Sequence, residues 1–114
     1  MLVEKNDIPK VEEHDPMGGR GHLLLEMLSE AVPLNARIDT LARATLAPGA
    51  AVGYHVHESD AEAYYFLSGI GEYNDGKSSY RVSAGDVTFT PMGEGHGIEN
   101  VGTEELVFIA LSVI

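Results

Sequence analysis

From residue 36 onward, apolar and polar positions alternate in short segments. Turn residues interrupt these segments at intervals of roughly eight to twelve positions, which is typical of the strands of a sandwich or barrel. No segment with a helical period follows residue 36. The pattern predicts eight strands, at residues 37–47, 52–57, 62–68, 70–74, 78–83, 86–90, 95–100 and 105–113.

Turn sequences separate the predicted strands. Asp75-Gly76 indicates a hairpin, because a tight turn needs positive φ and glycine adopts it without strain. Eight short strands in one small domain must close on themselves to hide their edges. The predicted fold class is therefore all-β, as a small barrel or jelly roll. The other turns are predicted at 48–50, 58–61, 84–86 and 92–95.

The first 35 residues do not share this regularity. The polar stretch before Gly21 is interpreted as an irregular arm or a lone edge strand. Residues 22–31 fit helical spacing through Leu24 and Met27 but strand alternation through Leu23 and Leu25, so periodicity leaves both open. We expect an N-terminal arm at 1–35 and a barrel domain at 36–114.

Composition narrows the functional classes. The 114 residues suffice for a single hydrophobic core, and no cysteine is present to form a disulfide or act as a nucleophile. Acidic residues outnumber basic ones 18 to 7, giving a formal charge of −11. Such a surface repels nucleic acid and anionic lipid. Neither a charged leader nor an apolar run of membrane-spanning length is visible, so we expect a cytoplasmic protein.

Histidine and carboxylate side chains gather around one predicted turn. His55 and His57 lie on the same face of a strand, about 6.6 Å apart, because strand side chains alternate. Glu62 begins the next strand beside them, and His96 lies on a later strand. If the barrel brings 95–100 against 52–57, three imidazoles and one carboxylate converge.

Such a group is a candidate metal site. Neutral imidazole suits first-row transition ions, and a carboxylate adds a hard anionic oxygen. Four protein ligands leave two positions of an octahedron for water, substrate or dioxygen. Fe(II) or Mn(II) fits best, with Ni, Co, Cu or Zn as alternatives. Taken alone, one His-x-His pair also fits two surface histidines that arose by chance.

The spacing of two longer motifs resembles the cupin superfamily. Residues 49–69 read G-x5-H-x-H-x4-E-x6-G, and residues 85–100 read G-x5-P-x-G-x2-H-x3-N. This resemblance implies a double-stranded β-helix with one divalent metal bound by His55, His57, Glu62 and His96. The remaining motif positions are expected to have structural roles in turns and loops: Gly49, Gly69, Gly85, Pro91, Gly93 and Asn100.

Within the cupins, the chain looks most like small single-domain bacterial proteins labelled as oxalate decarboxylases, which resemble half of a two-domain enzyme. Those enzymes carry an arginine three residues before the first motif histidine, where this chain has Val52. Arg37 or Arg43 would take its place for a bound anion if their strand faces inward. The alternative is that these two arginines lie on the outer face or in a dimer contact.

Other side chains are assigned by strand parity. Tyr64 shares the parity of Glu62 and is the candidate catalytic residue, as a hydrogen-bond donor, with barrel lining as the alternative. Phe66 and Ile98 are expected to line the substrate site with Arg43, and Phe89 is expected in the core. Turn carboxylates near the mouth are expected to be solvated, with a proton shuttle as the alternative: Glu58, Asp60 and Glu94.

Three functions remain open. The first is a metalloenzyme acting on a small anionic molecule, with dioxygenase-, oxidoreductase- or decarboxylase-like chemistry. The second is a sugar isomerase or epimerase, and the third is a non-catalytic, metal-dependent binding module. The resemblance also implies a homodimer, in which the N-terminal segment adds a strand to the neighbouring subunit's sheet.

Overall fold

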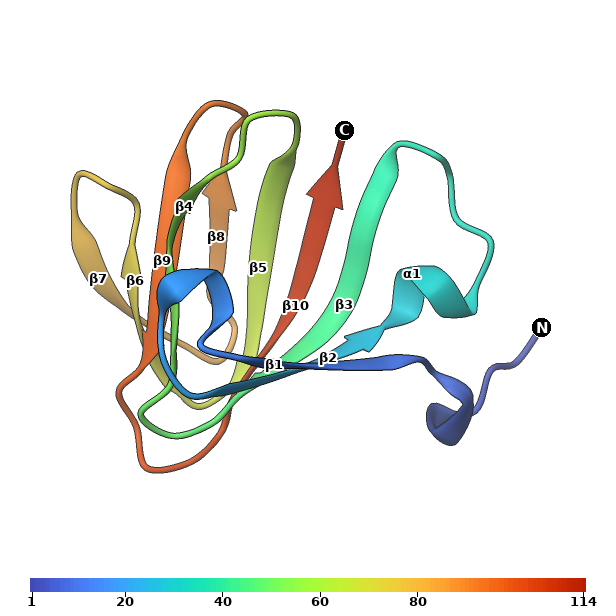
Figure 1. The fold of residues 1–114 in the computed structure, drawn as a ribbon, viewed down its shortest axis with the longest axis horizontal. Helices are drawn as coiled ribbons and strands as arrows, with labels where there is room; N and C mark the ends of the chain where they lie inside the picture. Colours follow the sequence, from blue (N-terminus) through green and yellow to red (C-terminus); the bar gives the residue numbers. More distant parts are fainter.

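A computed structural model describes residues 1–114. Two antiparallel sheets face each other across the core (Figure 1). None of the short helices has the length or apolar character needed to cross a membrane. The strands are β1 (Lys10–His14), β2 (His22–Met27), β3 (Ile38–Leu46), β4 (Ala51–Val56), β5 (Ala61–Ser68), β6 (Ile70–Asn74), β7 (Ser79–Ser83), β8 (Val87–Thr90), β9 (Gly95–Asn100) and β10 (Leu106–Val113). The helices are η1 (Lys5–Asp7), η2 (Pro16–Gly18) and α1 (Leu28–Ala31).

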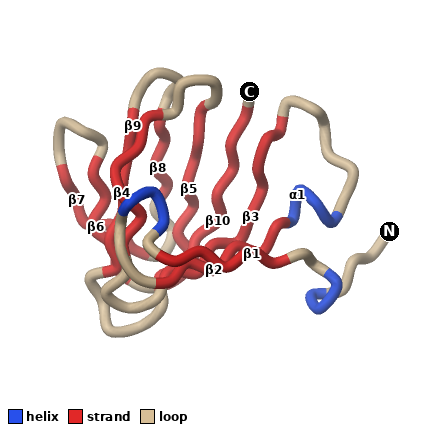
Figure 2. The backbone as a smooth tube through the Cα atoms, viewed as in Figure 1, coloured by secondary structure: helices blue, strands red, loops and turns tan.

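The strand order is that of a jelly roll. One sheet has the order β1-β2-β3-β10-β5-β8, and the other has the order β4-β9-β6-β7. Strands distant in sequence, such as β3 and β10, are hydrogen-bonded neighbours. Figure 2 shows that loops join the strands at both ends of the double layer. The predicted all-β, double-stranded β-helix class is confirmed.

The eight predicted strands from residue 36 onward are present, each within one residue of its predicted ends. The predicted hairpin at Asp75-Gly76 joins β6 to β7, and Gly76 has φ +89°. Turn sequences localised these boundaries well, because glycine adopts turn conformations that other residues avoid and proline cannot donate a hydrogen bond within a strand.

The N-terminal segment is more regular than the predicted arm. Residues 22–27 form a strand, β2, which pairs with β1 on one side and with β3 on the other. The strand alternative for the leucine-rich stretch is therefore the correct one. However, β2 joins the sheet of its own chain, where the expectation was a neighbouring subunit's sheet. Leu23 and Leu25 turn inward and cover one end of the core.

Residues 16–20 cross β4 at very short range. The amide of Arg20 donates to the carbonyl of Ala51 at 2.9 Å, and the amide of Ala51 donates back at 2.7 Å. A Cβ on Gly19 would lie 1.9 Å from the Ala51 carbonyl oxygen, and a Cβ on Gly53 would lie 2.1 Å from that of Met17. Both crossing positions therefore require glycine. This contact links the six-stranded sheet to the edge of the other sheet.

The motif glycines occupy left-handed turns. Gly69 has φ +90°, and a Cβ there would meet the carbonyl of Glu105 at 2.5 Å, so the position requires glycine on two grounds. Pro91 directly follows the end of β8. Positive φ is also found at Gly49, Gly85 and Gly93.

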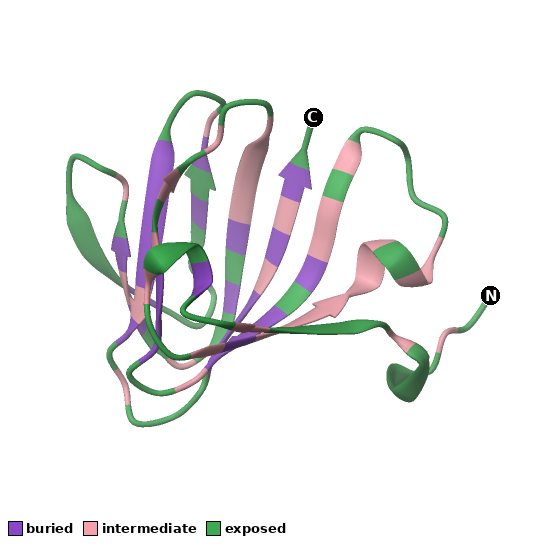
Figure 3. Ribbon diagram, in the orientation of Figure 1, coloured by how far each residue is buried: buried purple, intermediate pink, exposed green.

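The core lies between the sheets, and its largest side chains are aromatic. Phe66 and Phe108 are almost fully buried, with ring centroids 5.5 Å apart, and Tyr73 is 1 % exposed. Buried residues alternate with exposed ones in the second half of β5, and with intermediate ones in the second half of β10 (Figure 3). The expectation that Phe89 belongs to the core is wrong, because its side chain faces outward from β8 and is 64 % exposed.

Candidate metal centre

Three strands supply the candidate ligands. β4 carries His55, His57 follows its last residue, and β9 carries His96. β4 pairs with β9, which is the condition on which the expected convergence depended, and His55 lies directly opposite His96. Glu62 comes from β5 in the facing sheet. The centre therefore spans the space between the two sheets.

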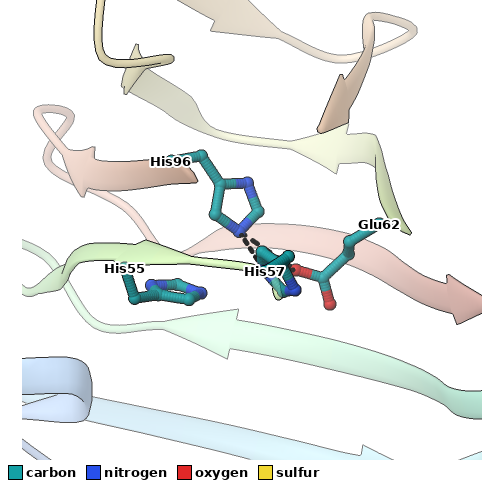
Figure 4. A group of neighbouring side chains, drawn as sticks. All are labelled: His55, His57, Glu62 and His96. Atoms are coloured by element: carbon teal, nitrogen blue, oxygen red, sulfur yellow. Dashed lines mark hydrogen bonds and ion pairs between the residues drawn. The ribbon is translucent and has the colours of Figure 1, made fainter. Parts of the chain in front are cut away.

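The donor atoms converge closely. The Nε2 atoms of His57 and His96 lie 3.0 Å apart, and Glu62 Oε1 lies 3.2 Å from the first and 3.1 Å from the second. Figure 4 shows these rings and the carboxylate directed toward one another, with the ring of His55 beside them. One ligand atom from each of the four residues lies within 4.8 Å of every other.

These separations fit a shared ion. Donor atoms that bind one ion at about 2.0–2.2 Å lie between about 3.0 and 4.4 Å apart. The three short distances match the lower end of this range, and the 4.8 Å limit requires only a small side-chain rotation. His96 is 1 % exposed, while His57 and Glu62 retain 11 % and 12 % of their side-chain exposure. The group is therefore largely shielded from solvent.

Hydrogen bonds on the far side of each ring orient the histidines. Nδ1 of His55 lies 2.8 Å from the carbonyl oxygen of Gly53, and Nδ1 of His57 lies 2.9 Å from Asp60 Oδ1. Both partners only accept hydrogen bonds, so each Nδ1 carries a proton and each Nε2 is the ring nitrogen turned toward the cluster. Such partners on the far side fix the orientation in which a histidine presents Nε2 to a metal ion.

The buried ring of His96 has a different support. Its Nδ1 lies 2.9 Å from both Tyr73 Oη and Thr90 Oγ1, which are themselves 2.7 Å apart. These hydroxyl groups hold the ring with its Nε2 toward Glu62. Burial raises the pKa of the Tyr73 phenol, which keeps the group protonated.

Burial shapes the ionisation of two further groups. It lowers the pKa of His55, and the neighbouring His96 and His57 lower it further against the opposing effect of the Gly53 carbonyl. A neutral imidazole is the form that binds metal. Burial also raises the pKa of Tyr64 well above its usual value, and the nearby Glu62 adds to this shift. Tyr64 therefore remains a hydrogen-bond donor.

A cavity of about 500 Å³, open to solvent, adjoins the centre. His55, His57, Glu62 and Tyr64 line one part of it. Tyr64 Oη lies 3.4 Å from His96 Nε2, and its ring stacks on the imidazole with centroids 4.8 Å apart. Tyr64 thus both lines the cavity and presents its hydroxyl group beside the ligands.

The three residues expected to bind substrate lie elsewhere. Arg43 faces outward from β3 and pairs with Glu26 at 3.2 Å, because Ala42 and Ala44 take the inward positions. Phe66 and Ile98 are buried in the core and do not line this cavity. Arg37 is exposed and also lies outside it.

Sequence reasoning missed part of the support around the ligands. Asp60 was expected to be solvated, yet it holds His57 and its side chain is only 19 % exposed. Its position three residues after His57 was the available signal, since a short turn brings such a pair together. No local signal identified Tyr73 or Thr90. Glu58 and Glu94 are exposed, as expected.

The fold and the cluster of three histidines and a glutamate that could hold a metal ion are those of a cupin-type protein, and comparison with known proteins agrees. Residues 42–114 match the family model described as "Cupin domain". The chain therefore belongs to the cupin family.

Two curated relatives carry names related to oxalate. The chain is 35% identical over 114 residues to the oxalate-binding protein of Thermotoga maritima, covering 100% of this chain and 94% of the relative. It is 36% identical over 75 residues to the oxalate decarboxylase OxdC of Bacillus subtilis. That match covers 61% of this chain but only 20% of the longer enzyme.

Solved structures show the same architecture. A Thermotoga maritima protein described as a predicted oxalate decarboxylase superposes with a TM-score of 0.91 at 36% identity, covering 100% of this chain and 99% of the other. A sugar phosphate isomerase of the cupin superfamily from Silicibacter pomeroyi superposes with a TM-score of 0.82 at 19% identity. That match covers 100% of this chain and 76% of the isomerase, and it supports the fold alone.

Proposed function

We propose that this protein binds oxalate or a closely related small carboxylate through one divalent metal ion. The observation that carries the proposal is the convergence of two Nε2 atoms and a carboxylate oxygen at 3.0–3.2 Å beside an open cavity. The similarity to an oxalate-binding protein over the full chain supports oxalate as the first candidate.

The ion would be held by His55, His57, Glu62 and His96. Three imidazoles with one carboxylate favour Mn(II) or Fe(II), while Zn, Ni, Co and Cu also accept such ligands. When bound, the ion supplies positive charge that attracts and polarises a carboxylate. This charge matters because neither lysine nor arginine lines the cavity.

The chain's own residues would bind and orient the ligand. Tyr64, protonated because of its burial, would donate its phenolic hydrogen to a carboxylate oxygen beside the ligand cluster. Val52 and Phe108 line the same cavity and exclude water from that side. The proposal is for binding. The segment shared with the oxalate decarboxylase makes decarboxylation the reaction to assay first.

Oxalate should stabilise the metal-loaded protein and leave the metal-free protein unchanged. A ligand that binds only the folded state at 100 times its Kd stabilises it by about 2.7 kcal/mol. The measurement is the melting temperature with and without oxalate, after loading with Mn(II) or removing metal by dialysis against chelator. Acetate is the control anion, and metal content is measured afterwards. Equal shifts in both forms would contradict the proposal.

We also propose that the protein is a homodimer, formed through the outer face of β8, β5 and β10. The outward residues there are apolar, and Val87 and Phe89 are 67% and 64% exposed. No charged side chain points outward from these three strands. In a chain with net charge −11, two copies repel least on such a neutral face. The other apolar residues of this face include Ala63, Tyr65, Leu67, Ile109, Leu111 and Val113.

Changing Phe89 to glutamate should convert the dimer to a monomer. The substitution places two like charges within a desolvated contact, which costs several kcal/mol. Sedimentation velocity measures the mass, and 12.2 kDa is that of one chain. Thr103→Glu, in the exposed loop before β10, is the matched control. A wild-type protein that sediments as a monomer at high concentration would refute the dimer.

A further inference from the structure

We infer that the ligand is larger than oxalate: a 2-oxo carboxylate with an apolar substituent, such as an aryl or branched alkyl group. The inference rests on the proposed function, since the metal would hold the 2-oxo carboxylate head. It specifies, in addition, which class of molecule the rest of the cavity accepts. Three observations support it: the size of the cavity, its apolar floor and the charge of its rim.

The cavity is much larger than oxalate. Allotting each of the six heavy atoms of oxalate the roughly 30 Å³ of a liquid water molecule gives roughly 180 Å³ as a generous limit. The cavity measures about 500 Å³. By the same measure, phenylglyoxylate, with eleven heavy atoms, needs roughly 330 Å³. The cavity therefore has room for an aryl group beyond the chelating head.

Small side chains create this room. Ala42, Ala44 and Ala110 all line the cavity from the inner face of β3 and β10. Ala110 lies directly opposite Ala42 on one side and Tyr64 on the other. Three neighbouring alanines in strand positions leave the space that larger β-branched residues usually fill.

The apolar floor begins beside the metal centre. Ser112 lies opposite Glu62, and Ala110 is two residues further along the same strand, about 6.8 Å away. A ligand whose head contacts the ion near Glu62 and Tyr64 can therefore lay its substituent over Ala110 and Ala42. Leu23 and Leu25 of β2, with Val52 of β4, enclose this region.

The charge at the rim of the cavity favours a ligand with one negative charge over a ligand with two. Glu13, Asp39 and Glu58 line the cavity in addition to the ligand Glu62, and no lysine or arginine offsets them. Oxalate brings two carboxylates into this field. A 2-oxo carboxylate brings one, because its second chelating oxygen is a neutral carbonyl. Removing one like charge near several carboxylates lowers the repulsion that opposes binding.

Calorimetric titration of the Mn(II)-loaded protein with three probes tests the inference: oxalate, pyruvate and phenylglyoxylate. Pyruvate and phenylglyoxylate share the head and differ in the substituent, methyl against phenyl. We expect phenylglyoxylate to bind at least about tenfold more tightly than pyruvate, because its ring buries apolar surface. In Zn(II)-loaded protein with labelled alanine methyl groups, the ring protons of bound phenylglyoxylate should give NOEs to the methyl groups of Ala110 and Ala42.

Ala110→Val should occupy part of the space above Ala110 and weaken phenylglyoxylate binding by about tenfold, since a difference of one methyl-sized group in an apolar pocket changes affinity by about this factor. Oxalate and pyruvate binding should stay within about twofold. Ala42→Val is a second filling variant, and Ala84→Val on the exposed β7–β8 turn is the matched control. If neither filling variant folds, the comparison of phenylglyoxylate with pyruvate in the wild-type protein decides.

The outcomes separate the two proposals. If oxalate binds but phenylglyoxylate binds no better than pyruvate, the larger ligand class is refuted and metal-dependent oxalate binding stands. If phenylglyoxylate binds tightly and Ala110→Val has no effect on it, its ring lies elsewhere and the inference is also refuted. If the metal-loaded protein binds none of the three probes, both proposals fail.

Discussion

Replacing His57 by alanine should leave the purified protein with almost no bound metal. Nε2 of His57 lies within 3.2 Å of both Nε2 of His96 and Oε1 of Glu62, so its loss removes a donor that takes part in two of the three short contacts. We expect metal affinity to fall by more than the 10–100-fold that changes in supporting residues cause. Plasma mass spectrometry and competition with a chromophoric chelator measure the two effects.

Two companion variants make this experiment specific. Asp60→Asn keeps the shape of the residue but removes the carboxylate that accepts from His57 Nδ1, and should weaken metal binding by about 10–100-fold. His14→Ala removes an exposed histidine outside the cluster and should have no effect. A His57→Ala protein that retains metal at full occupancy would exclude this site.

Replacing Asn100 by alanine should strongly destabilise the fold. Its buried amide nitrogen donates to the carbonyls of Leu46 and Glu104 at 2.9 and 2.8 Å, and its oxygen accepts from the amide of Gly102 at 3.0 Å. The side chain therefore joins the end of β3 to the loop before β10. Leaving such buried groups without partners costs about 1–3 kcal/mol each, so we expect a loss of about 3–5 kcal/mol.

Thermal and urea denaturation of the Asn100→Ala protein measure this loss. A change of this size lowers the melting temperature by roughly 10 °C or more in a domain of this length. Asn74→Ala is the matched control, because Asn74 is exposed and accepts one hydrogen bond, from Gly76. If both variants melt within about 2 °C of the wild-type protein, water replaces the amide and the assigned role is wrong.

Local chemistry explains why the sequence predicted the strands and the ligands. His55 and His57 share a face because strand side chains alternate, and turn residues located the strand ends within one residue. The same alternation correctly placed Tyr64 beside Glu62. These features depend on neighbours in the chain, which a single sequence records directly.

The errors involve contacts between distant segments. The alternation of side chains along β3 does not determine which of its two faces is the inner one. The pairing of β3 with β2 and β10 places Arg43 on the outer face. Phe89 looks like a core residue by composition, yet it lies on the outer face of a sheet edge. Tyr73 and Thr90 reach His96 only because β6 and β8 pack around β9. No local pattern encodes that arrangement.

X-ray diffraction from crystals of protein purified without added metal would test the central claim most directly. Data collected above and below the absorption edges of manganese, iron and zinc identify any bound ion. We expect one anomalous peak per chain, within about 2.0–2.3 Å of Nε2 of His55, His57 and His96 and of a carboxylate oxygen of Glu62. After the crystals are soaked in Mn(II), the absence of any peak among these four residues would contradict it.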